Sequence, residues 1–171
     1  MFENYQVLRI QLNGQDMYIL WYSNTRDGIY VNETTGVIPI FGNMQMLMDF
    51  CSDNRINIIS DEIIFCNLDL IRGWLEKPTE YGIKYDDFFH VWNIIHDVAW
   101  SIEDLDELEE LYSNYYILYD KLFWGAMMES RETHQSRYYQ DWNEEELESL
   151  QGIFEKGINY FRYHSEMVTG N

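Results

Sequence analysis

The sequence is poor in basic residues and in cysteine, and each shortage excludes a class of protein. Eleven Lys and Arg against thirty Asp and Glu give the 171 residues a formal charge of −19. A surface of that sign repels nucleic acid and anionic lipid. The two cysteines, Cys51 and Cys66, match no zinc-binding or CxxC spacing, and their apolar neighbours predict buried free thiols. We therefore expect no direct nucleic-acid binding and no disulfide framework.

Long apolar runs are missing as well. No stretch of about twenty apolar residues could span a bilayer, and the start MFENYQVLRI lacks the basic and apolar regions of a secretory signal. We expect a cytoplasmic protein that does not insert into membranes. Yet 46% of the residues are hydrophobic and 17% are aromatic, which is enough for a packed core. The acid therefore belongs to the surface of a folded domain.

Catalytic motifs are also absent. The sequence has no GxGxxG, P-loop, HExxH, GxSxG or EF-hand pattern. The nearest approach to a metal site is Asp86, Asp87 and His90, followed on the same predicted helix by His96 and Asp97. A bundle-type metal site needs a second such group on another helix, so an enzyme or metalloprotein stays open only if these side chains converge. We predict no cofactor, no metal and no enzymatic activity.

Alternating apolar residues predict strands in the first third of the chain. From Tyr5 to about residue 32 the pattern favours an antiparallel meander, with turns at Asn13-Gly14 and Asp27-Gly28. Such pairs suit a type I′ turn because both central positions need positive φ. Pro39 limits the next short strand to an edge or a strand start, and residues 57–65 form a further strand or two.

A first short helix is predicted at 44–54, with Asn43 as its N-cap, and helical spacing of apolar residues dominates from residue 66 onward. The later predicted helices cover 68–77, 85–101 and a block from about 102 that stops at Gly125. Residues 126–141 are predicted as a loop, and the last helix begins at Asn143 and frays by Val168. The sequence thus predicts a single α+β domain over 1–171. An N-terminal antiparallel β-meander packs against about four helices, with 1–65 mainly strands and 66–171 mainly helices.

The acidic side chains are concentrated in the part of the chain that is predicted to be helical. Residues 1–60 carry three basic and six acidic side chains, whereas 61–171 carry eight and twenty-four. Acids near a helix start complement the helix dipole, but two runs exceed what capping requires, and like charge costs stability. This excess indicates attraction to a positively charged partner. The runs are Glu103, Asp104, Asp106, Glu107, Glu109 and Glu110, and then Asp141, Glu144, Glu145, Glu146 and Glu148.

Aromatic residues are more numerous than one small core usually takes up, with six Trp, fourteen Tyr and nine Phe. Tyr and Trp anchor protein interfaces because they offer large rigid area with a polar tip. Several lie directly before the second acidic run, which predicts aromatic anchors inside an acidic rim. The predicted partner-binding residues are the whole first run together with Tyr138, Tyr139, Asp141, Trp142, Glu144, Glu145 and Glu148.

The segment FCNLDLIRGWLEKPTEYGIKYDDFFHVWNIIHDVA (Phe65–Ala99), with LYDKLFWGAMM and WNEEELESLQGIFEKG after it, resembles small bacterial immunity proteins of contact-dependent growth inhibition and related polymorphic toxin systems. The resemblance rests on the placement of aromatic residues and leucines. It implies a cytoplasmic protein that binds the C-terminal domain of one cognate toxin, commonly a basic nuclease, and blocks its active site or nucleic-acid surface. The family shares no catalytic residues, so the binding residues above come from charge alone.

Two other interpretations use the same features. A DNA-mimic or anti-restriction protein would direct the acid against a host DNA-binding protein. Alternatively, an edge strand near Pro39 could pair with a strand of the partner, which would place the interface in the less acidic part. The sequence leaves the identity of the toxin and the oligomeric state open.

Overall fold

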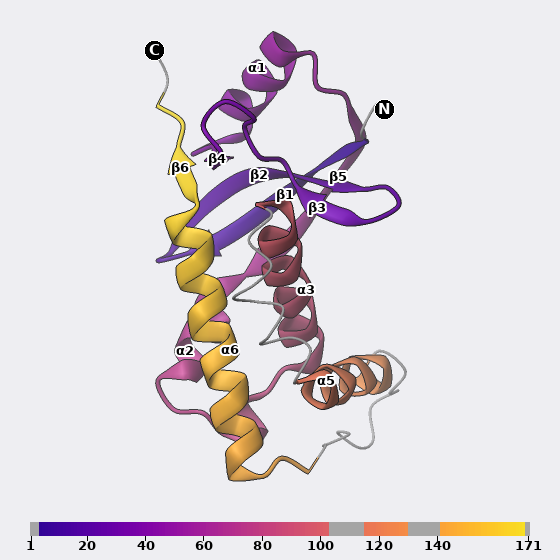
Figure 1. Ribbon diagram of the computed structural model, residues 1–171, viewed down its shortest axis with the longest axis vertical. Helices are drawn as coiled ribbons and strands as arrows, with labels where there is room; N and C mark the ends of the chain where they lie inside the picture. The colour runs from indigo at the N-terminus through magenta and orange to yellow at the C-terminus, as the bar shows by residue number, and fades with distance from the viewer. Residues whose placement is uncertain (1–3, 103–114, 130–140, 170–171) are drawn as a thin grey trace.

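A four-stranded sheet occupies one end of the computed structural model, which describes residues 4–102, 115–129 and 141–169 (Figure 1). The strand order is β3-β2-β1-β5, made of β1 (Tyr5–Leu12), β2 (Gln15–Ser23), β3 (Asp27–Ile29) and β5 (Ile58–Asn67). The first three strands form the predicted antiparallel meander. β5 instead runs parallel to β1, which the long connection after β3, through a short strand and a helix, makes possible. The sheet is therefore mixed, and the expectation of a purely antiparallel one was wrong.

The turn between β1 and β2 is the predicted one. Asn13 and Gly14 have φ values of 57° and 70°, as a type I′ turn requires. Their backbone amides donate to the Asp69 carboxylate, with both N···O distances 2.7 Å. The first turn of a later helix therefore holds the hairpin in place.

The predicted turn at Asp27-Gly28 was wrong, because both residues lie within β3 and pair with Ser23 and Tyr22. The chain turns instead at residues 24–26. Gly28 has a packing role, since a Cβ there would overlap the Tyr22 hydroxyl and press on Ser101 Oγ. The glycine lets the end of a helix approach the sheet closely.

α1 (Met44–Asn54) packs on one face of the sheet, over the first residues of β1, and it begins where it was predicted. The Asn43 side chain accepts from the Met46 amide at 3.0 Å and caps the helix. Leu47 and Cys51 are buried in a small core beneath α1, together with Tyr5, Val7, Leu20 and Phe41.

Both cysteines are free and buried, as predicted. Burial raises the pKa of Cys51 to about 11. Burial, with a smaller contribution from Asp87, raises the pKa of Cys66 to about 12. Neither thiol is therefore activated as a nucleophile at neutral pH.

A second, two-stranded sheet pairs the C-terminal part of the chain with residues 38–40. β4 (Ile38–Ile40) runs parallel to β6 (Ser165–Met167), although the sequence predicted that the last helix continues toward Val168. On the other side of β4, Tyr18 and Phe41 exchange two backbone hydrogen bonds of 2.9 Å. Pro39 lies in a strand of a two-stranded sheet, and each strand of such a sheet is an edge strand, as predicted. One side of β4 is already paired with the protein's own β6.

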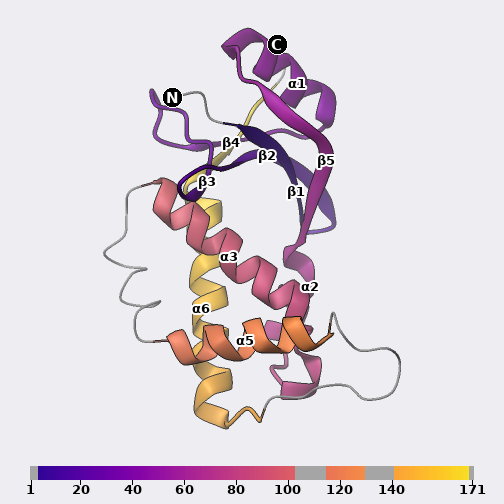
Figure 2. The same cartoon turned by 90° about the vertical axis from the view of Figure 1, so that its right-hand side faces the viewer.

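The other face of the sheet packs on the helical layer. α2 (Leu68–Leu75) ends before Lys77-Pro78, a 3₁₀ turn covers Glu80–Gly82, and α3 (Tyr85–Ser101) lies at the centre, with α5 (Tyr116–Glu129) and α6 (Glu144–Tyr163) packed against it (Figures 1 and 2). The α+β architecture is therefore as predicted, with five α-helices in the described residues. None of them is long and apolar enough to cross a membrane.

The sequence predicted that a helix stops at Gly125, and this prediction was wrong. α5 continues through it to Glu129, so residues 126–129 are helical, and the rest of the predicted loop up to residue 140 lies outside the described ranges. A Cβ at Gly125 would overlap the ring of Tyr85 on α3. The glycine therefore permits close packing of two helices.

Candidate functional site

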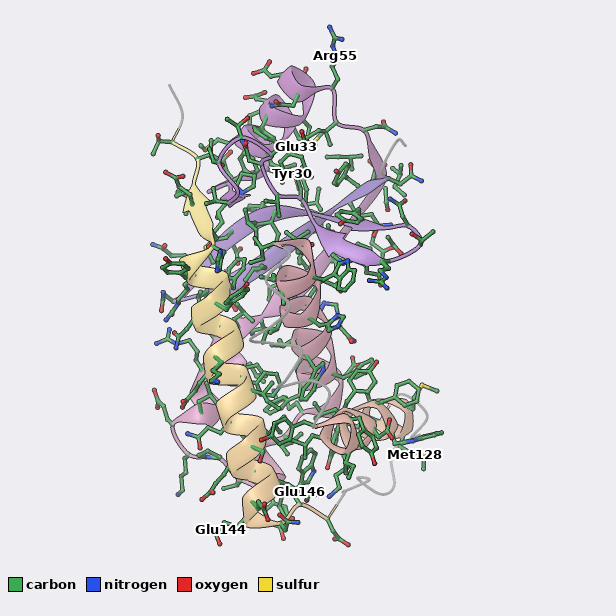
Figure 3. The ribbon with its side chains drawn as sticks, viewed as in Figure 1. Tyr30, Glu33, Arg55, Met128, Glu144 and Glu146 are labelled. Carbon is green, nitrogen blue, oxygen red and sulfur yellow. The ribbon has the colours of Figure 1, made fainter. Side chains whose placement is uncertain are left out.

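The structure describes five of the predicted partner-binding residues: Asp141, Trp142, Glu144, Glu145 and Glu148. They lie just before α6 and in its first two turns, at the end of the molecule opposite Arg55, as the positions of Arg55 and Glu144 show (Figure 3). The others lie outside the described residues, namely Glu103, Asp104, Asp106, Glu107, Glu109, Glu110, Tyr138 and Tyr139.

The first turn of α6 is fixed by a capping box. The Asn143 side chain accepts from the Glu146 amide, and the Asn143 amide donates to Glu146 Oε2, both at 2.9 Å. Lys121 Nζ of α5 lies 2.6 Å from each oxygen of the same carboxylate. Glu146 therefore has a structural role, since it satisfies the helix start and pairs with a cation.

The other acids of this run have no such pairing. Asp141, Glu144, Glu145 and Glu148 are exposed, and no salt bridge within the described residues includes any of them. Glu144 and Glu145 interact favourably with the helix dipole, but their charge still faces solvent. These four carboxylates form a negative surface around the start of α6, which no cation of the described residues pairs with.

Trp142 is not an exposed anchor, and this part of the prediction was wrong. Its side chain is only 7% exposed and belongs to the main core. The indole Nε1 donates to the Tyr85 hydroxyl at 3.2 Å. Trp142 precedes the N-cap Asn143, a position where an apolar side chain commonly folds back onto its own helix. That local rule was the signal for its burial.

Exposed apolar side chains gather instead on α5. Ile117, Trp124 and Met128 are 52%, 55% and 37% exposed, and their spacing of seven and four residues places them along one side of the helix. We call these three residues the α5 stripe. The opposite side of the helix is buried, so α5 is apolar on both faces; its buried residues are Leu118, Leu122, Gly125 and Ala126.

The α5 stripe lies beside the acidic start of α6. Lys121 is on the same side of α5, between Ile117 and Trp124, and its ammonium reaches Glu146 and also the Asp141 carbonyl oxygen at 2.6 Å. The two helices are seen together at this end of the molecule (Figures 2 and 3). We call the combined area the α5–α6 surface: Ile117, Trp124, Met128, Asp141, Glu144, Glu145 and Glu148.

This arrangement is suited to binding a protein. Exposed apolar patches rimmed by polar residues are typical of interaction sites, and Trp is the residue type most enriched among those that dominate binding energy. The sequence pointed to an acidic rim around aromatic anchors, but of the three aromatic residues it named Trp142 is buried, and Tyr138 and Tyr139 lie outside the described residues. The missed signal was α5 itself, because its sequence has large apolar residues on more than one face, and a single core can cover only one of them.

The histidine and carboxylate group on α3 does not form a metal site. No cluster of three or more His, Cys, Asp or Glu within the described residues could hold a metal ion. Burial lowers the pKa of His90, against the opposing effect of Asp86, Asp87 and Asp97. His90 is therefore neutral at pH 7.

Comparison with known proteins gives a fold and no family. No family model matches the sequence, and no curated protein is similar to it. A solved structure of similar fold is the C-terminal domain of SatS, crystallised in complex with bromine. It aligns with a TM-score of 0.60 at 11% identity, over 96% of this chain and 94% of that one. At this identity the similarity establishes the architecture alone.

Proposed function

We propose that this protein binds and neutralises a basic protein in the cytoplasm, without catalysis, as an immunity protein does for its cognate toxin. The expected partner is the C-terminal domain of a toxin, commonly a nuclease whose surface is positive because it holds phosphates. Occlusion of that surface or of the active site would stop the toxin.

The observation that supports this function most strongly is the α5–α6 surface in a chain of charge −19. Exposed carboxylates there attract and orient a positive partner, which raises the association rate. Trp124 and its apolar neighbours then supply area that loses water on binding, which slows dissociation. One surface thus offers both long-range attraction and short-range affinity.

The test is binding of the purified protein to the domain encoded directly upstream, because an immunity gene usually follows its toxin gene. We expect nanomolar affinity that weakens as salt rises from about 50 mM to about 500 mM, since screening shortens the reach of surface charge. We also expect loss of toxicity when both proteins are present. No binding at any salt concentration would refute the immunity function.

Duplex DNA serves as a competitor in the same assay. A DNA mimic would compete with DNA for several unrelated DNA-binding proteins, whereas an immunity protein would bind its one cognate domain and ignore the others. Competition for many unrelated basic proteins would therefore replace the proposed function with the DNA-mimic alternative.

A further inference from the structure

A cavity of about 690 Å³ lies between α3 and the sheet, and it is separate from the α5–α6 surface. Asp97 and Trp21 line it, with Trp100 and Arg26 at one side and Tyr119 of α5 at another. A volume in the range of about 300–1,000 Å³ is typical of sites for organic ligands. We call this cavity the α3 pocket.

Asp97 is the first unusual feature of the α3 pocket. It is 8% exposed, and it is the one charged side chain of the described residues that is buried in the core. Trp21 Nε1 donates to Oδ2 at 2.9 Å, and His96 Nδ1 lies 3.9 Å from Oδ1. A carboxylate can accept about four hydrogen bonds, and a buried one normally has a full set of partners. Asp97 therefore has capacity for a donor from the pocket.

The walls of the pocket suit a cation. Trp21, Trp100 and Tyr119 are aromatic, and the faces of such rings attract cations within about 6 Å. Arg26, on the exposed turn between β2 and β3, places its guanidinium carbon 3.8 Å from the centre of the Trp100 ring. The protein's own guanidinium thus already stacks on one wall.

Charge favours the same class of ligand. Among the described residues, two carboxylates, those of Asp27 and Asp97, line the pocket against the one guanidinium of Arg26, and the whole chain carries −19. His90, another lining residue, adds no positive charge at pH 7 because burial lowers its pKa. An anion would meet repulsion here, whereas an organic cation would gain a carboxylate partner and aromatic contacts.

We propose that the α3 pocket binds the guanidinium group of an arginine-like ligand, with Asp97 as its charge partner and Trp100, from which it displaces the exposed Arg26, as its stacking surface. Guanidinium fits better than ammonium because it is planar, offers several donors and stacks on indole. The group arrives either on a free small molecule or on an arginine side chain of a bound protein.

The test uses Nα-acetyl-arginine amide as the probe and Nα-acetyl-citrulline amide, its uncharged analogue, as the control ligand. We follow the indole N–H signals by NMR. The Trp21 signal should shift and saturate with the arginine probe. The signals of Trp74 and Trp142 should stay in place, because their indoles donate to Thr79 O and the Tyr85 hydroxyl and neither residue lines the pocket. An unmoved Trp21 signal, or equal binding of citrulline, would overturn the proposal.

Variants test the named contacts. Asp97→Asn keeps an acceptor for Trp21 but removes the charge, and it should weaken the arginine probe about tenfold or more. Asp86→Asn removes an exposed charge from the same helix and should leave binding unchanged. If Asp97→Asn does not fold, Trp100→Ala at the half-buried end of α3 replaces it and should also weaken the probe. Full affinity in a folded pocket variant would contradict the site.

A further experiment distinguishes the two sources of the guanidinium group. It is the one part of this test that rests on the proposed function. If the arginine belongs to the toxin domain, Asp97→Asn weakens toxin binding as well as probe binding. If the ligand is a free molecule, the variant loses the probe and keeps the toxin. A protein that binds the probe but no toxin domain would refute the proposed function and leave the α3 pocket standing.

Discussion

α5 and the start of α6 lie at the same end of the molecule, but they expose opposite kinds of side chain. α6 has a capping box at its start, a buried apolar face and an exposed face rich in acid. α5 buries one apolar face and exposes another, with Trp124 at its centre. The properties of an amphipathic helix account for α6 completely. They do not account for the exposed apolar face of α5, which the proposed binding of a partner would explain.

The largest expected effect is a difference in stability between variants on the buried and the exposed face of α5. Leu122→Ala, at a fully buried position, should lower the free energy of unfolding by about 2–5 kcal/mol through lost burial and a cavity. Ile117→Ala, on the exposed face, should change it by less than about 0.5 kcal/mol. Urea denaturation of both variants checks this. Equal losses would mean that both faces are buried in solution.

The next largest effect is a loss of toxin binding without a loss of stability. Trp124→Ala should weaken toxin binding by about thirtyfold, or about 2 kcal/mol, if this indole anchors the interface. Its stability should be close to that of the wild type. Tyr163→Ala is the matched control, because it removes another exposed aromatic side chain from the far end of α6. Isothermal titration calorimetry compares the two, and an equal loss for both would refute a local anchor on α5.

Two helical glycines sharpen the comparison between α5 and α6. Gly125→Ala in α5 should destabilise the protein by about 1–3 kcal/mol, because the new methyl group overlaps Tyr85. Gly152→Ala in α6 meets no atom within 4 Å and should stabilise the helix by about 0.5–1 kcal/mol. Thermal unfolding of each variant gives the sign. A stable Gly125→Ala protein would show that α5 does not pack closely on α3.

The smallest expected effect concerns the acids of α6. Replacing Glu144, Glu145 and Glu148 with Gln should slow toxin association about three- to tenfold at low salt and flatten its salt dependence, with little change in dissociation. The control replaces three exposed acids of the sheet end, with Glu33→Gln, Asp53→Asn and Glu62→Gln. Stopped-flow kinetics measures both. An equal effect from the control would assign the attraction to net charge rather than to this surface.

Local signals in the sequence predicted many elements correctly. Asn143 and Glu146 mark the start of α6, Asn43 marks α1, and Asn13-Gly14 marks the first hairpin. Each of these features depends on residues within four positions of one another, so a pattern along the chain is sufficient. The spacing of apolar residues likewise gave both ends of α3.

The features that the sequence missed depend on distant partners. The roles of Gly28 and Gly125 follow from Tyr22 and Tyr85, which only the fold brings close. The parallel direction of β5 and the existence of β6 depend on pairing with β1 and β4, far away in the chain. The candidate site followed the same division, because the acids were identified from composition whereas the exposed position of Trp124 required the packing of α5 on α3.

Hydrogen exchange of the protein with and without the toxin domain tests the central claim most directly. The α5–α6 surface predicts that backbone amides of α5 and of the first turn of α6 exchange more slowly in the complex, while those of α1 at the opposite end stay unchanged. Protection confined to α1 and the sheet, with α5 exchanging at its unbound rate, would contradict it.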